Sequence, residues 1–224
     1  MDTLSQRLCS SRGAPSRRAV LLTGLAGAGK TLLLDRLSEL GEQVIDLERL
    51  ANHSGSVFGG LGRTQQPSHD QFQQLVNDAW SSANPESLIW IEDEGPFIGS
   101  VGLPSWLVET MPQHPVVEVV ADRDERVSRL VNQYGSIPPS DLEAALNRLD
   151  QRLDRSRIDT AINAIRAGRL RDAIEIVLDY YDSAYNHRLT TQQRRIVTTY
   201  RLTADEPCDL IRLVNENVRG ALDA

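Results

Sequence analysis

The chain has 224 residues, 40% of them hydrophobic and 25% charged, a composition typical of a globular protein with one substantial core. Acidic residues outnumber basic residues by 31 to 24, and the net charge of −7 argues against a general nucleic-acid coat protein while still allowing a local basic surface. No apolar run approaches the roughly 20 residues that cross a membrane, and the polar N-terminus lacks the hydrophobic centre of a secretory signal. Cys9 and Cys208, the two cysteines, have no metal-ligand spacing, so we expect a cytoplasmic protein.

The N-terminal half alternates short apolar runs with helical patterns. A polar lead-in, residues 1–17, precedes a single predicted domain, residues 18–224. The apolar run at 18–23 predicts a buried strand, and residues 31–40 beyond the following glycines have helical spacing. A second short strand is predicted at 43–46.

The remaining elements complete an α/β pattern. Apolar runs at 87–92 and 116–121 predict two more strands. Strands that alternate with helices are typical of a doubly wound, mostly parallel sheet, here of the P-loop NTPase or kinase-like type. Residues 122–190 have helical periodicity and are expected to form a helical insertion or lid. A late strand at 194–202 and a closing helix at 209–222 follow.

The segment LLTGLAGAGKTLLLDRL, residues 21–37, contains the only lysine of the chain. Its spacing fits G-x-x-x-x-G-K-[ST], and a strand before it and a helix after it argue against a chance match. Glycines let backbone N–H groups approach phosphate oxygens, the lysine contacts the terminal phosphates, and the threonine hydroxyl can hold Mg²⁺. A bulky, planar arginine would not fit the lysine position. The predicted phosphate-binding residues are Gly24, Gly27, Ala28, Gly29, Lys30 and Thr31.

Acidic residues follow the ends of two predicted strands, where α/β sheets bind ligands. The candidate catalytic residues are Glu92, Asp93 and Glu94 after one strand, and Asp46 and Glu48 after another. The candidate magnesium ligands are Thr31, Glu92 and Asp93. Two structural alternatives stay open: the residues at 92–94 could simply end a strand at the surface, and Asp46 or Glu48 could cap a helix.

A long polar segment, residues 52–72, separates the second strand from the next helical pattern. Structureless stretches of this length inside a compact domain are usually functional or disordered. Its polar side chains are therefore candidate ligand contacts, although a mobile solvated loop explains them equally well. The candidate substrate-binding residues are His53, Ser56 and Arg63, together with Arg126 from the helical half; Gln66 and His69 are further polar residues of the segment.

Several phrases of the sequence resemble the C-terminal P-loop domain of bacterial tRNA 2-selenouridine synthases. They are GLAGAGKTLLLDRLSELGEQVIDLERLANHSGSVFG, QPSHDQF, the acidic strand end with IG at 98–99, RVSRLVNQYG and DYYDSAY. The similarity runs from about Leu21 to Tyr185, and the phrases DLE-x-LA-x-H and YYD are more specific than a phosphate loop alone.

The resemblance implies a chemistry. Enzymes of that family act on the wobble 2-thiouridine of tRNA, attach a geranyl group to its sulfur from geranyl diphosphate, and then replace S-geranyl with selenium from selenophosphate. It implies that residues 24–31 hold a diphosphate and that the site is lined by Asp46, Glu48, His53, Glu92 and Glu94.

The chain departs from the family pattern in two ways. Family members usually carry an N-terminal rhodanese domain with an active-site cysteine, so we expect selenation to require a separate rhodanese protein. The family also typically has basic residues at Ser54 and within the stretch Gly95 to Phe97, where this chain has none.

Arginines recur through the helical half and admit two interpretations. They could form a face for an RNA backbone, but interleaved aspartates favour a solvated surface with i,i+4 ion pairs. The arginines are Arg148, Arg152, Arg155, Arg157, Arg166, Arg169 and Arg171, followed by Arg188, Arg194 and Arg195. The best aromatic cluster, Tyr180, Tyr181 and Tyr185, could stack bases or pack in the core.

Three functions remain in competition. The first is a tRNA-modifying transferase domain of the 2-selenouridine synthase type. The second is an ATP-dependent small-molecule or nucleotide kinase with the helical region as its lid, and the third is a nucleotide-binding regulatory module. All three imply Mg²⁺ with either ATP or GTP or geranyl diphosphate, and the sequence leaves the choice between these ligands open.

Overall fold

The computed structural model describes residues 18–149, 152–192, 195–202, 216 and 218. The polar lead-in predicted at 1–17 and both cysteines lie outside the described residues. So does nearly all of the closing helix predicted at 209–222.

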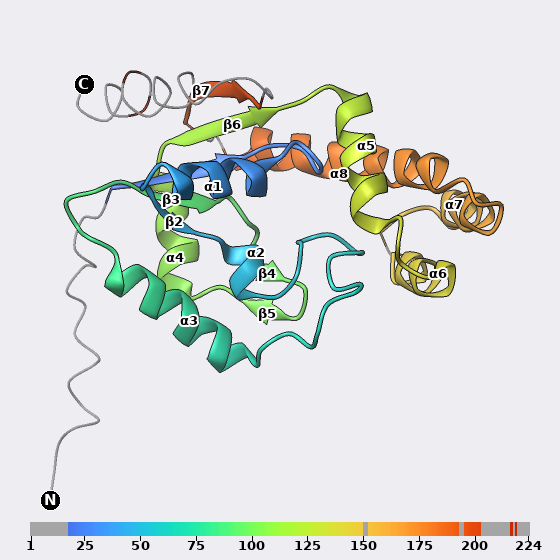
Figure 1. Cartoon of the computed structure of the whole chain (residues 1–224), viewed down its shortest axis with the longest axis horizontal. Helices are drawn as coiled ribbons and strands as arrows, with labels where there is room; N and C mark the ends of the chain where they lie inside the picture. The colour runs from blue at the N-terminus through green and yellow to red at the C-terminus, as the bar shows by residue number, and fades with distance from the viewer. Residues whose placement is uncertain (1–17, 150–151, 193–194, 203–215, 217, 219–224) are drawn as a thin grey trace, which may run out of the picture.

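A five-stranded sheet forms the centre of the molecule (Figure 1), with strand order β2-β3-β1-β6-β7 and every neighbouring pair parallel. Its strands are β2 (Gln43–Ile45), β3 (Ile89–Glu92), β1 (Ala19–Thr23), β6 (Val116–Val120) and β7 (Ile196–Arg201). The predicted doubly wound parallel sheet is confirmed, and each predicted strand is present within two residues of its expected ends. A small antiparallel hairpin, β4 (Phe97–Ile98) with β5 (Val101–Gly102), was not predicted.

Alternating side chains of the strands form two separate cores. Leu21 and Ile91 pack on one face with α3 (His69–Ser82) and α4 (Ser105–Thr110). Leu22 and Trp90 pack on the other face with α1 (Lys30–Glu39). Because strands covered on both faces are apolar throughout, the continuous runs in the sequence were the correct signal for them.

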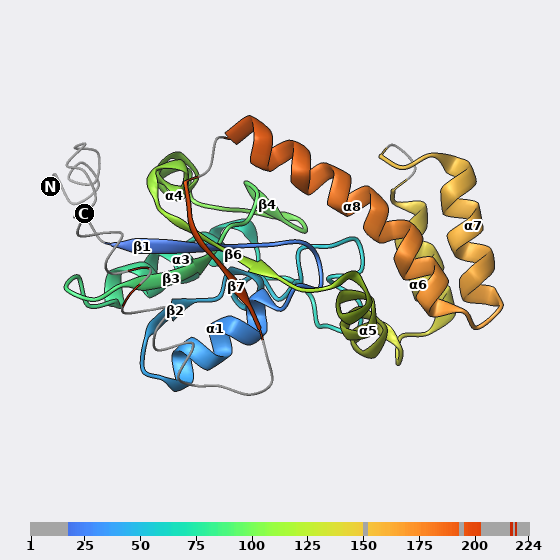
Figure 2. The ribbon, with the colours of Figure 1, turned by 90° about the horizontal axis from the view of Figure 1, so that it is seen from above.

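The helical half forms an extension at one end of the sheet. Figure 2 shows α5, α6 and α7 gathered there, with α8 running back alongside the sheet. The helices are α5 (Arg123–Tyr134), α6 (Pro139–Asn147), α7 (Arg155–Arg166) and α8 (Leu170–Gln192), which we call the helical arm. Leu146, Ile158 and Ile165 belong to a core of its own. The helical character predicted for this region is confirmed.

The polar segment after β2 is shorter than predicted. Helix α2 (Leu47–Leu50) lies before the predicted segment, and α3 already begins at His69, because Ser68 and Gln71 form a reciprocal capping box. A single turn of 3₁₀ helix, η1 (Met111–Gln113), precedes β6. In the described part of the chain, no helix has both the length and the apolar character needed to cross a bilayer.

Candidate phosphate-binding site

The phosphate loop, residues 24–31, connects β1 to α1 at the carboxyl end of the sheet. Gly24 and Gly29 have φ angles of 148° and 103°, which residues other than glycine rarely adopt. A Cβ on Gly24 would lie 2.4 Å from the carbonyl oxygen of Val119. Gly29 is the N-cap of α1 and supplies no side-chain cap, so the first N–H groups of α1 are available to an anion.

Two side chains of the loop, Lys30 and Thr31, have defined contacts, and that of Thr31 is with Glu92 at the end of β3. The Lys30 ammonium donates to the carbonyl of Gly24 at 3.2 Å, so the side chain folds back over the loop. Thr31 Oγ1 donates to Glu92 Oε1 at 3.3 Å, and the backbone N–H of Glu48 donates to Glu92 Oε2 at 3.1 Å. The fully buried Glu92 therefore connects the phosphate loop with the segment after β2.

The carboxylates at the two strand ends form one electrostatic cluster. Burial, followed by the charges of Glu48 and Glu94, raises the pKa of Glu92 well above its ordinary value. Burial and the neighbouring Glu94 raise the pKa of Glu48 to about 7, and burial also raises the pKa of Glu94. Lys30 opposes all three shifts. The cluster thus favours a proton or a further cation at neutral pH.

Thr31 and Glu92 are suited to bind a magnesium ion that is also coordinated by the phosphate of a ligand. The hydroxyl of Thr31 and the carboxylate of Glu92 are hard oxygen donors of the kind Mg²⁺ prefers, and a cation would relieve the repulsion that raises the carboxyl pKa values. Within the described residues, no three His, Cys, Asp or Glu side chains form a complete metal centre. A magnesium ion here would therefore take its remaining ligands from water and from phosphate oxygens. The third expected ligand, Asp93, lies with its carboxylate 3.5 Å from Arg188.

A cavity of about 870 Å³ adjoins the phosphate loop. Its polar lining includes Lys30, Thr31 and the carboxylates Asp46, Glu48, Asp93 and Glu94. Its apolar and aromatic lining, which we call the tyrosine wall, consists of Leu32, Leu130, Ala184 and three tyrosines, Tyr134, Tyr181 and Tyr185. The cavity therefore combines phosphate-binding groups with apolar and aromatic surface.

The protein itself holds the hydroxyl of each tyrosine. Tyr134 shares a hydrogen bond with Ser56 at 3.2 Å. Tyr181 accepts from the backbone N–H of Val57 at 2.7 Å, and Tyr185 donates to Glu118 at 3.3 Å. Burial raises the pKa of both Tyr181 and Tyr185 to about 12, so they stay neutral. With the hydroxyls engaged, the half-buried Tyr181 and Tyr185 offer ring surface to a ligand, whereas Tyr134 is only 5% exposed and packs on Phe58.

Two of the expected substrate-binding residues line the cavity and His53 does not. Ser56 and Arg63 line the cavity, and Arg63 donates to Ser54 at 2.7 Å. His53 is packed against Gly59, Gly60 and Gly99, and its buried Nδ1 has no hydrogen-bond partner within the described residues.

Two expected residues have structural contacts of their own. Arg126 is buried behind the phosphate loop, where it bonds to Ala26 and Asp182. Asp46 lines the cavity and also caps α2 by accepting from the N–H of Arg49, so the helix-cap alternative is realised.

Several cavity residues were not proposed from the sequence. Tyr134, Arg129 and Leu130 all lie on α5, and Arg188 of α8 donates to the carbonyl of Asp93 at 3.0 Å. The phrase RVSRLVNQYG, which helped to carry the family resemblance, contains the three α5 residues, and DYYDSAY ends shortly before Arg188. Their place in the site was not predicted, because they reach it only when the helical arm packs against the sheet.

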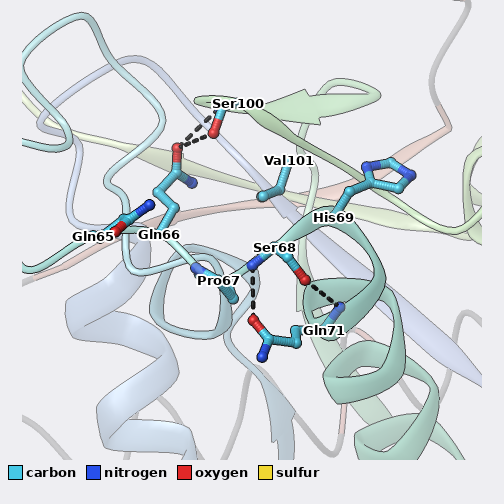
Figure 3. A pocket seen from close by; sticks show the side chains of 8 residues that line it. All are labelled: Gln65, Gln66, Pro67, Ser68, His69, Gln71, Ser100 and Val101. Atoms are coloured by element: carbon cyan, nitrogen blue, oxygen red, sulfur yellow. Dashed lines mark hydrogen bonds between the residues drawn. The ribbon is translucent and has the colours of Figure 1, made fainter.

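A second depression, of about 700 Å³, lies beside the start of α3 (Figure 3). Its polar groups are engaged with one another: Gln66 Oε1 accepts from the N–H and hydroxyl of Ser100, and Ser68 and Gln71 cap α3. His69 Nδ1 accepts from the N–H of Gly102. Gln66 and His69 therefore hold the β4–β5 hairpin against the loop before α3.

The arginines of the helical arm are largely paired with acids. Arg155 contacts Asp159, Arg157 contacts Asp179, and five further pairs follow the same pattern. These five join Arg123 to Asp179, Arg166 to Glu143, Arg169 to Asp172, and Arg171 to both Asp124 and Glu175. The ion-paired helix surface is confirmed for Arg155, Arg157, Arg166, Arg169 and Arg171, but among these pairs only Arg155–Asp159 and Arg171–Glu175 have the predicted i,i+4 spacing.

Sheet order, phosphate loop and acidic strand end together define a P-loop α/β protein with a kinase-like arrangement. The family model "tRNA 2-selenouridine synthase AAA domain" matches residues 17–166. The chain therefore belongs to the tRNA 2-selenouridine synthase AAA domain family, as the resemblance predicted.

Relatives from bacteria carry the same family name. The tRNA 2-selenouridine synthase of Cupriavidus pinatubonensis is 31% identical in an alignment 219 residues long, and the alignment covers 83% of this chain and 58% of the relative. That of Sulfurovum sp. is 27% identical over 211 residues, covering 80% of this chain and 56% of the relative. The chain thus spans about half the length of the curated relatives it matches.

Two solved structures with similar folds are more distant. TT1252 from Thermus thermophilus has a TM-score of 0.44 at 16% identity and covers 92% of this chain and 97% of its own. A shikimate kinase from Acinetobacter baumannii, in complex with shikimate, has a TM-score of 0.41 at 16% identity, with coverages of 91% and 96%.

Proposed function

We propose that this chain is the donor-binding transferase domain of a tRNA-modifying system of the 2-selenouridine synthase type. The donor is geranyl diphosphate, and the acceptor is the sulfur of a 2-thiouridine in tRNA. The observation that carries this choice is the tyrosine and leucine wall beside the phosphate loop. An apolar chain attached to a diphosphate matches the two kinds of residue that line that cavity.

The phosphate end is suited to stabilise a leaving diphosphate. When the thiouridine sulfur forms a bond to C1 of the geranyl group, the C1–O bond breaks and its electron pair leaves with the diphosphate. In this proposal the diphosphate is held by Lys30 and the N-terminus of α1, whose positive charge and N–H groups would stabilise the developing negative charge. Thr31 and Glu92 would hold a magnesium ion, which when bound neutralises part of the same charge.

The carboxylate cluster supplies a base. Alkylation of the thiouridine sulfur is completed by loss of the N3 proton from the base. Glu48 lines the cavity, and its pKa of about 7 suits a group that must accept a proton at neutral pH. The predicted catalytic role of Glu92, Asp93, Glu94 and Asp46 stays a proposal, in which they set the charge around Glu48 and the metal.

Calorimetry with three ligands in the presence of Mg²⁺ tests the donor. We expect geranyl diphosphate to bind at least tenfold more tightly than inorganic pyrophosphate, since the wall adds apolar contact. An anticodon stem-loop containing 2-thiouridine should then become S-geranylated, as measured by mass spectrometry. Tight ATP binding with turnover on a small acceptor, and no preference for the geranyl chain, would instead identify a kinase. ATP binding without turnover would identify a regulatory module.

Selenium insertion requires a further component in this proposal. Replacing S-geranyl by selenium would use a rhodanese-type cysteine loop on a separate protein. The test is a selenophosphate assay on geranylated tRNA with and without an added rhodanese protein. Selenation by this chain alone would contradict the requirement.

A further inference from the structure

Two arginines of α5 donate to carbonyl groups of the phosphate loop, Arg129 from the lining of the cavity and Arg126 from outside it. Arg126 Nε donates to the carbonyl of Ala26 at 2.9 Å. Arg129 Nη1 donates to the carbonyls of both Gly27 and Ala28 at 3.0 Å. Three successive carbonyl groups of the loop are thus fixed by guanidinium groups. A Cβ on Gly27 would lie 2.8 Å from the carbonyl of Arg126, so the backbones also lie in direct contact.

Fixing these carbonyls also fixes the N–H groups of the same peptide planes. In a trans peptide the C=O of one residue and the N–H of the next point in opposite directions. The carbonyls of Ala26 and Ala28 point toward α5, so the N–H groups of Gly27 and Gly29 point away from it. Both glycines line the cavity. The arginines therefore set the direction in which the loop offers donors to an anion.

Arg126 is itself held by the helical arm. Its two terminal nitrogens donate to the two carboxylate oxygens of Asp182 in α8, at 3.0 and 2.5 Å. The Arg126 side chain is 4% exposed and that of Asp182 is 19% exposed. A bidentate pair in this setting fixes the guanidinium plane, which a lysine at the same position would not do.

We propose that Arg126 and Asp182 are positioning residues that set the anion affinity of the phosphate loop from outside the cavity. The helical arm then controls donor binding through one buried ion pair, without Arg126 touching the donor. This inference rests on the proposed binding of a diphosphate by the loop.

The experiment measures pyrophosphate binding by calorimetry with Mg²⁺, together with hydrogen exchange of residues 24–31. Arg126→Lys keeps the charge but loses the bidentate geometry, and we expect about tenfold weaker binding and faster exchange at Gly27 and Gly29. Asp182→Asn should weaken binding in the same direction. When Asp182→Asn is combined with Arg126→Lys, we expect little further loss of pyrophosphate affinity, because both changes act through one interaction.

The matched control is Arg171→Gln. Arg171 joins the same two helices by contacts with Asp124 and Ser128 and has no contact with the phosphate loop. We expect its pyrophosphate affinity to stay within a factor of two of the parent, whatever its melting temperature.

A double variant covers the case in which a single change prevents folding. Arg126→Met with Asp182→Leu removes both charges and leaves none unpaired in the interior, so the fold is retained. Its pyrophosphate affinity should still fall about tenfold. Parental affinity and parental exchange in this variant would overturn the inference. A parent that binds pyrophosphate but fails to alkylate tRNA would overturn the proposed function alone.

Discussion

Lys30 gives the most direct test at the scale of single residues. It is the only lysine, so the chain has only two kinds of amine, the Lys30 ammonium and the N-terminal amine. Bound geranyl diphosphate should shield Lys30 from an amine-directed reagent and leave the N-terminal amine reactive, as read by mass spectrometry after proteolysis. Lys30→Met should lose about 1.5–3 kcal/mol of pyrophosphate binding.

Lys30→Arg is the control for charge alone. We expect little rescue, because the wider guanidinium does not fit between the loop and its ligand. Equal labelling with and without ligand, together with an arginine variant that binds like the parent, would contradict the role of Lys30.

Glu48 makes stability depend on pH. Its pKa rises from an ordinary 4.5 to about 7 on folding, so the folded chain binds this proton more tightly than the unfolded chain does. The charged Glu48 carboxylate therefore destabilises the folded chain. This effect is absent below about pH 4.5, develops between pH 4.5 and 7, and is complete above that range. Glu48→Gln should therefore raise the free energy of unfolding at pH 8 by up to about 3 kcal/mol.

Thermal melts at pH 8 and pH 4.5 measure this effect. A gain of 1 kcal/mol corresponds to about 2–4 °C for a chain of this size. The gain should vanish at pH 4.5, and the exposed Glu39→Gln should show no comparable gain at either pH. An equal gain of Glu48→Gln at both pH values would mean that packing, rather than charge, is responsible.

Some site residues could be predicted from the sequence and others could not. The two groups differ in how far along the chain their contact partners lie. Lys30, Thr31 and the glycines act through a local spacing that can be read directly. Arg129 and Tyr134 reach the cavity only through contacts between α5 and the segments around residues 27 and 56. Long-range packing of this kind has no local pattern.

At the scale of elements, the turn from β1 into α1 depends on Gly24. A Cβ there would lie 2.4 Å from the Val119 carbonyl, and the φ of 148° is itself unfavourable for a side chain. Gly24→Ala should therefore cost a few kcal/mol of stability and most of the pyrophosphate binding. The measurements are chemical denaturation and calorimetry.

Gly95→Ala is the matched control for this turn. An added Cβ at Gly95 meets no atom within 4 Å, so its stability should stay within about 0.5 kcal/mol of the parent. A Gly24→Ala variant that is as stable as Gly95→Ala would show that β6 can move away from the loop.

Periodicity recovered the long elements and failed on the short ones. The central strands β1, β3 and β6 appear as apolar runs because they are covered on both faces, whereas the edge strands β2 and β7 are partly exposed. Strands β4 and β5 have two residues each, too few for any repeat. The start of α3 was readable from Ser68 and Gln71 as a capping box, but the polar composition around it favoured a loop.

At the scale of the whole molecule, charge restricts where the tRNA of the proposed function would contact the chain. The net charge is −7, and the arginines of the helical arm are compensated by neighbouring carboxylates. Arg63 differs from them: it is exposed, lines the cavity, and donates to the neutral hydroxyl of Ser54. We therefore expect RNA phosphates to be contacted near the mouth of the cavity rather than along α7.

The salt dependence of tRNA binding tests this arrangement. Each phosphate contact adds roughly −0.7 to −0.9 to the slope of log affinity against log salt concentration. Arg63→Gln should make the slope less steep by about that amount. The charge-neutral pair Arg155→Gln with Asp159→Asn removes an ion pair of α7 without changing the net charge, and should leave the slope unchanged. A slope that responds to the α7 pair and not to Arg63 would place the RNA along α7 rather than at the mouth of the cavity, and would require a different route for the thiouridine into the cavity.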